Sequence, residues 1–82
     1  MINFMVELIK PEHYRFDDTA FGNEQLRFKD LMKENLLQQV NMNKELTHFW
    51  LIFKVDSRET MLEVLQTLPI CSSFERKISE LV

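Results

Sequence analysis

Among the side chains that could transfer a proton, two stand in otherwise apolar runs. His48 lies within LTHFWLIFKV, and an imidazole can shuttle protons near neutral pH. Its alternative role is structural, as a hydrogen-bonded histidine near the start of a strand. Glu7 lies within INFMVELI, where a buried carboxylate would need a basic partner. The alternative role of Glu7 is a cross-strand ion pair, for which the candidate partners are Lys54, Arg76 and Lys77.

Three further residues have reactive or titratable side chains but a weaker case. Cys71 has no base near it in the sequence, and a thiolate nucleophile needs one, so we interpret it as a small, half-buried filler. His13 and Tyr14 fall in an expected loop, either over the mouth of a cavity or simply in solvent. With one cysteine and two histidines the chain cannot build a Cys/His metal cluster, and we expect no such metal site.

Length and composition indicate one small globular domain, residues 1–82. The chain has 82 residues, 45% of them hydrophobic, with one glycine and two prolines. The net charge of −3 is made of dispersed basic and acidic residues, which disfavours binding to nucleic acid. A single cysteine, an N-terminus unlike a signal peptide and the lack of a long apolar run predict a cytoplasmic protein without a membrane span.

The first half of the chain predicts a strand followed by a long helix. Over residues 2–9 an apolar set, Ile2, Phe4, Val6 and Leu8, alternates with the mixed set Asn3, Met5, Glu7 and Ile9, and Lys10-Pro11 ends the pattern. A helix is expected to begin between Asp18 and Glu24, where capping residues cluster, and to continue to about Leu37. Residues 38–42 could extend that helix or form a short strand, and we favour the strand.

The second half predicts a buried strand, a short helix and a last strand. Residues 46–55 are apolar on both parities, as in a strand that is buried on both faces. Asp56, three residues before Glu59, resembles a capping box for the helix that follows. Leu68-Pro69 ends this helix, and the alternation from Phe74 onward predicts the final strand.

The predicted order β-α-β-β-α-β forms a four-stranded antiparallel sheet with both helices on one face. The other face then contains either the Phe49/Leu51/Phe53 row or the Trp50/Ile52 row. Either row is too apolar to be left in water. We therefore expect a partner, most simply a second copy of the chain, to cover it.

The C-terminal run FKVDSRETMLEVLQTLPICSSFERKISEL resembles the muconolactone isomerase family, whose members have a strand ending in a turn, an amphipathic helix, a Leu-Pro join and a final strand. The matching residues are Phe53, Val55, Ser57, Glu59, Leu65, Leu68-Pro69 and Leu81. A weaker match upstream includes Phe4–Leu8, Pro11, Glu24, Leu31 and Glu34. The resemblance implies a ferredoxin-like α+β fold in which subunits pair through their sheets into an α+β barrel.

The resemblance also implies a reaction, the cofactor-independent isomerisation of a small lactone or organic acid by proton abstraction and return. Glu24 aligns with the cavity glutamate of the family, and an apolar surround would suit a carboxylate for the role of base. The alternative for Glu24 is a capping or surface residue near the first turn of the helix. The positions where the family carries a tyrosine and an asparagine are Thr47 and Phe49 here. We take both as substrate-binding positions, together with Glu7 and His48.

Two functions from different classes follow. One is an isomerase-like enzyme with Glu24 as its catalytic residue. The other is a non-catalytic oligomeric module of the same fold, which binds a ligand or assembles, and in which the replaced polar residues reflect lost chemistry. An RNA-recognition domain shares the element order, but the chain is acidic overall and the third strand lacks the basic and glycine residues of the usual RNA-binding motif, which argues against it.

Overall fold

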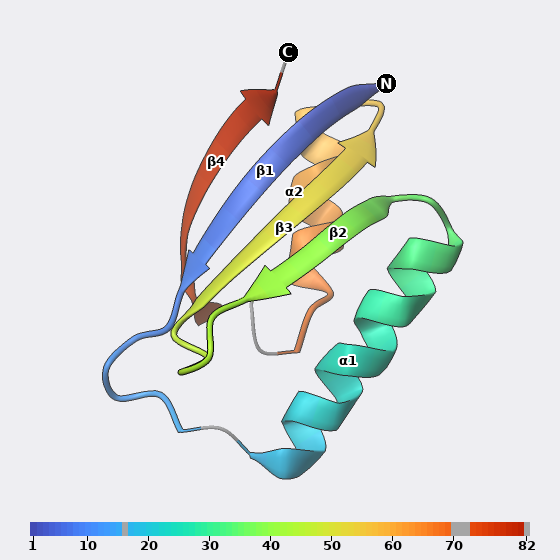
Figure 1. Cartoon of the computed structure of the whole chain (residues 1–82). Coiled ribbons are helices and arrows are strands. Elements are labelled where there is room, and N and C mark those ends of the chain that lie inside the picture. The colour runs from blue at the N-terminus through green and yellow to red at the C-terminus, as the bar shows by residue number, and fades with distance from the viewer. Residues whose placement is uncertain (16, 70–72, 82) are drawn as a thin grey trace.

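A computed structural model describes residues 1–15, 17–69 and 73–81. It contains, in chain order, β1 (Ile2–Ile9), α1 (Asp18–Lys33), β2 (Leu37–Met42), β3 (His48–Val55), α2 (Arg58–Gln66) and β4 (Glu75–Leu81). The strands form one antiparallel sheet in the order β2-β3-β1-β4, and both helices lie on the same side of it (Figure 1). This is a small α+β fold, and its element order and strand order fit the ferredoxin-like arrangement.

Helix α1 begins where the sequence predicted but ends earlier. Asp17 is its N-cap and accepts a hydrogen bond from the backbone N–H of Thr19 at 3.2 Å. Asn35 adopts a left-handed backbone with φ of 63°. The N–H of Asn35 then bonds the Met32 carbonyl at 3.1 Å and the N–H of Leu36 bonds the Leu31 carbonyl at 3.0 Å. These two bonds form a Schellman motif, so the chain leaves the helix before Leu37 instead of at it.

Strand β3 is also shorter than predicted, because the turn that connects it to β2 includes its first two predicted residues. Residues 38–42 are strand, as favoured from the sequence, but β3 begins at His48 and not at Leu46. Leu46 has φ of 58° and donates its N–H to the Asn43 carbonyl at 3.1 Å. A left-handed leucine closes a tight turn and cannot continue a strand.

Helix α2 is capped by a different residue from the one expected. Ser57, not Asp56, is the N-cap, and its side-chain oxygen accepts from the backbone N–H of Thr60 at 3.2 Å. Asp56 accepts from the Thr60 hydroxyl at 2.8 Å and so supports the same turn. The helix ends at Gln66, before Leu68-Pro69. The interpretation of Cys71 as a filler falls outside the described residues.

The core lies between the sheet and the helices, and the strand register decides which residues enter it. Phe4 of β1 pairs with Phe53 of β3, Val6 with Leu51 and Leu8 with Phe49, so all six share one face. The fully or nearly fully buried cluster on this side consists of Phe4, Val6, Leu8, Phe28, Leu31, Leu37, Phe49, Leu51, Phe53, Val55, Met61, Leu65, Leu68 and Phe74. Of the two alternative rows, the Trp50/Ile52 row therefore faces away from the helices.

None of the helices in the described part of the chain has the length and apolar character that a membrane span requires.

Candidate functional site

The strand register divides the predicted site residues between two sides of the sheet. Glu24 and Phe49 lie on the helix side, within the core or against it. Glu7 and His48 lie on the opposite side, because Glu7 pairs with Trp50 and His48 pairs with Ile9. We call this second side the open face. Thr47 stands in the loop just before β3. The candidates therefore do not converge on one point within a single copy.

Glu24 is buried. The alternative stated from the sequence, a capping or surface role near the first turn of the helix, required an exposed side chain instead. Helix α1 begins at Asp18, so Glu24 lies in its second turn, four residues before Phe28 and four after Ala20. This position is in the stripe that packs on the sheet, and the side chain is 0% exposed. It is the only charged residue that is buried among those the structure describes. A buried carboxyl costs free energy unless it is hydrogen-bonded, paired or neutral, so its presence in an apolar stripe calls for a reason.

No pocket is found around Glu24 or elsewhere among residues 1–15, 17–69 and 73–81. Aromatic rings fill the space near Phe49 instead. Phe49 meets Phe74 edge to face with ring centres 5.8 Å apart, and Phe74 meets Tyr14 in the same way at 5.2 Å. Phe49 is therefore a core residue in this structure. A substrate could contact it only if the core opened.

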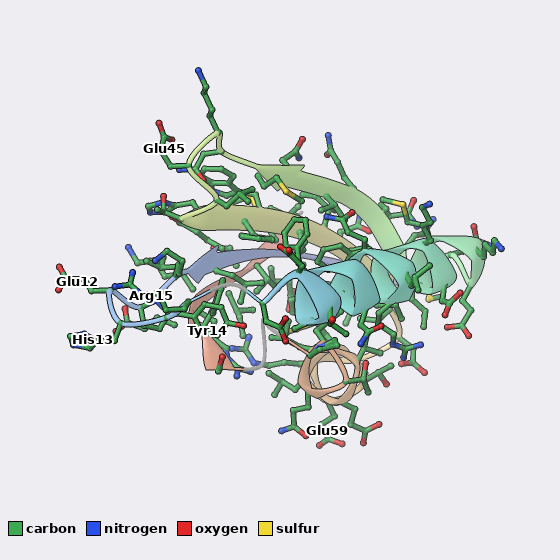
Figure 2. The ribbon with its side chains drawn as sticks, turned by 90° about the horizontal axis from the view of Figure 1, so that it is seen from below. Glu12, His13, Tyr14, Arg15, Glu45 and Glu59 are labelled. Atoms are coloured by element: carbon green, nitrogen blue, oxygen red, sulfur yellow. The ribbon has the colours of Figure 1, made fainter. Side chains whose placement is uncertain are left out.

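The loop between β1 and α1 places its two candidates differently. His13 is exposed and projects away from the body, beside Glu12, whereas Tyr14 turns inward and is half-buried (Figure 2). Tyr14 packs against the core through its edge-to-face contact with the Phe74 ring, with centres 5.2 Å apart. Solvent exposure, the simpler expectation, holds for His13 but not for Tyr14.

The open face has an apolar centre and a polar border. Its centre is formed by the two middle strands and contains Met5, Glu7, Ile9, His48, Trp50 and Ile52, all half-buried. None of the four apolar residues in this group belongs to the core cluster or packs against it. The border is formed by exposed residues, mostly from the outer strands and all polar except Leu81: Asn3, Gln39, Asn41, Lys54, Glu75, Lys77, Ser79 and Leu81.

The register narrows the choice of partner for Glu7. Lys77 of β4 lies directly opposite Glu7 on the open face. Arg76 pairs with Leu8 and so belongs to the helix side, while Lys54 pairs with Asn3, which is four residues from Glu7 along β1. Of the three basic residues predicted as partners, only Lys77 is thus an immediate cross-strand neighbour.

A hydrogen-bond network holds His48 at the edge of the open face. The Asn43 Oδ1 atom accepts from the backbone N–H groups of Thr47 and His48 at 2.9 and 3.0 Å. The Asn43 Nδ2 atom donates to the Thr47 Oγ1 atom at 2.7 Å, and that hydroxyl lies 3.0 Å from His48 Nδ1. The His48 ring stacks on Trp50 with centres 5.7 Å apart and planes 16° from parallel. His48 is therefore hydrogen-bonded, as its structural alternative required.

Sequence reasoning did not single out Asn43, Met5 or Ile9. The sequence of β1 already indicated which side of that strand faces away from the core. One of its two alternating sets is purely apolar, whereas the other, Asn3, Met5, Glu7 and Ile9, includes polar residues. For Asn43 the only signal was its place in an Asn-Lys turn.

Fold and register together define a small α+β sheet protein with one uncovered face. No family model matches the chain, and no curated protein matches it significantly. The likeness to muconolactone isomerases therefore remains a hypothesis about relationship.

Proposed function

We propose that this protein is a non-catalytic assembly module in which a second copy of the chain covers the open face. The observation that supports the proposal best is the apolar centre of that face, bordered by exposed polar residues. This distribution, with apolar residues inside and a polar rim outside, is typical of protein–protein interfaces.

The size of the face is compatible with a weak, reversible dimer. Four strands of about eight residues, spaced ~4.8 Å apart and rising ~3.3 Å per residue, present roughly 500 Å². Two copies would then bury ~1,000 Å² in total, which is about the lower limit for a specific interface. Such a dimer would be concentration-dependent, not permanent.

Charge also favours a second copy over a nucleic acid. The open face carries two acidic side chains, Glu7 and Glu75, and two lysines, Lys54 and Lys77. These charges balance on the face although the whole chain has a net charge of −3. A balanced face can pack against itself without net repulsion, whereas it offers a polyanion little attraction.

Sedimentation velocity over micromolar to millimolar concentrations tests this proposal. Ile52→Lys places a charge at the centre of the open face, and we expect it to abolish a dimer that the wild type forms. The matched control is Leu26→Lys, which changes a leucine that is 60% exposed on α1 and should leave the dimer intact. Circular dichroism confirms that both variants fold. A wild type that stays monomeric throughout, or an Ile52→Lys protein that still dimerises, would refute the proposal.

The second candidate is the isomerase-like enzyme, and the burial of Glu24 is the observation in its favour. In this proposal Glu24 removes and returns the proton of a small lactone or organic acid, with Glu7, Thr47, His48 and Phe49 as substrate-binding residues. A base must come within about 2.6–3.2 Å of the proton donor, so a cavity beside Glu24 would have to open. Glu7 and His48 could reach that cavity only from another copy.

Deuterium exchange from solvent into an unsaturated lactone tests the enzyme. If Glu24 is the base, Glu24→Gln should lower the exchange rate by roughly 100-fold or more. Glu63→Gln, which alters an exposed glutamate on α2, is the matched control. No exchange by the wild type, or equal exchange by both variants, removes this candidate.

A further inference from the structure

The orientation of the Asn43 amide is fixed by its surroundings. Its Oδ1 atom accepts from two backbone N–H groups, those of Thr47 and His48. Because an amide nitrogen could not accept either bond, the NH₂ group must be the one that faces the Thr47 hydroxyl at 2.7 Å. Asn43 is therefore a donor to Thr47 Oγ1.

This direction determines what the Thr47 hydroxyl does next. With Oγ1 accepting from Asn43, its own hydrogen has one acceptor within reach among the described residues, His48 Nδ1 at 3.0 Å. A hydroxyl that donates to Nδ1 requires this ring nitrogen to be unprotonated. The neutral imidazole then carries its hydrogen on Nε2, whereas the opposite tautomer would leave the Thr47 hydrogen without a protein acceptor among the described residues.

The network lies where it can act on the open face. His48 is half-buried there, stacked on Trp50 at 5.7 Å, and diagonal to Glu7. The hairpin that carries the network is held in place by a further bond, from the backbone N–H of Lys10 to the Thr47 carbonyl at 2.8 Å. The ring is thus positioned by the Thr47 hydroxyl at Nδ1 and by Trp50 on its face, and Nε2 has no hydrogen-bond partner among the described residues.

We propose that Asn43 and Thr47 position His48 so that its Nε2–H donates a hydrogen bond to an acceptor oxygen of the second copy. This inference rests on the proposed self-association through the open face. The acceptors that a second copy offers are the carboxylates of Glu7 and Glu75 and the side-chain oxygens of the polar border. Asn43 and Thr47 act through His48 and are positioning residues.

The first test is the tautomer of His48, read by ¹⁵N NMR at about pH 9, where imidazole groups are neutral. His13, the only other histidine and an exposed one, is an internal control. We expect His48 to show one tautomer, with hydrogen on Nε2, and His13 to show a mixture. Thr47→Val, which keeps the side-chain shape but removes the hydroxyl, should bring His48 to the same mixture. Hydrogen on Nδ1 of wild-type His48 would overturn the inference.

The second test is the dimer dissociation constant of two His48 variants. His48→Gln retains a nitrogen donor near the Nε2 position, and we expect dissociation within about threefold of wild type. His48→Phe retains the aromatic ring over Trp50 but has no donor, and it should weaken the dimer about tenfold, as expected for one lost interfacial hydrogen bond. If the two variants have equal dissociation constants and Ile52→Lys still abolishes the dimer, the role of His48 is refuted and the self-association is not. A monomeric wild type would instead refute the self-association and this inference together.

Discussion

Replacing Asn43 by alanine is the sharpest test of how the β2–β3 connection is held. The side chain makes three hydrogen bonds at 2.7, 2.9 and 3.0 Å, all within a half-buried loop. It also sits beside Leu46, whose left-handed backbone at φ 58° costs about 1–2 kcal/mol for a residue other than glycine. The network must therefore maintain a turn that the backbone alone would not favour.

The expected loss can be worked from these bonds. At a net ~1 kcal/mol each, three bonds correspond to about 2–3 kcal/mol of the free energy of unfolding. A chain of 82 residues has a total stability of only ~4–12 kcal/mol. A loss of this size should lower the Tm by roughly 10–20 °C. Asn43→Asp keeps the acceptor for both backbone N–H groups and should cost ~1 kcal/mol or less.

Urea denaturation followed by fluorescence measures both variants, because Trp50 is the single tryptophan and stacks on His48 next to the network. Asn41→Ala is the matched control, since Asn41 is an exposed asparagine of β2, the strand that ends just before Asn43, and it should change stability by less than ~0.5 kcal/mol. The reasoning fails if Asn43→Ala is no more destabilising than Asn41→Ala, or if Asn43→Asp costs as much as the alanine variant.

Two further substitutions probe the fold. Asn35→Gly should raise the free energy of unfolding by a few tenths of a kcal/mol and Asn35→Ala should lower it by about 1 kcal/mol, because φ of 63° suits glycine and penalises alanine; thermal melts of the pair would show the opposite shifts, and equal melts would contradict the Schellman assignment. Phe49→Ala should cost ~3–5 kcal/mol as a large-to-small change in a closed core, whereas a loss below ~1 kcal/mol in urea would mean that Phe49 lines an open site.

The sequence was sufficient for the type and order of the elements, and it failed where the backbone turns left-handed. Hydrophobic periodicity predicts that α1 and β3 exist and roughly where they lie, but it carries no information on φ. It therefore extended α1 past Asn35 and began β3 at Leu46. The asparagine at position 35 was a usable stop signal, since asparagine tolerates this conformation. The leucine at position 46 gave no such signal, because leucine adopts a left-handed backbone only under constraint, here from the hydrogen bonds of Asn43.

The candidate site was harder to predict because it depends on register and on one helix boundary. Both parities of β3 are apolar, so only its pairing with β1 shows that Phe49 faces the core and Trp50 the open face. For Glu24 the decisive uncertainty was the start of α1. A start at Glu24 would have put the carboxylate in an exposed first turn, whereas the actual start at Asp18 puts it in the buried stripe with Phe28.

The same geometry separates the two candidate functions, because the sheet stands between them. Glu24 is buried on the helix side, and the proposed interface is on the other side. Proton transfer needs heavy atoms within about 3 Å, so Glu24 cannot serve a ligand held on the open face of its own copy. Distant sites with no shared contacts contribute independently. We therefore expect Glu24→Gln to leave the dimer dissociation constant unchanged within about twofold, as sedimentation velocity would show. A dimer weakened tenfold by this substitution would mean that the core and the open face are coupled, and the assignment of assembly to the open face alone would be wrong.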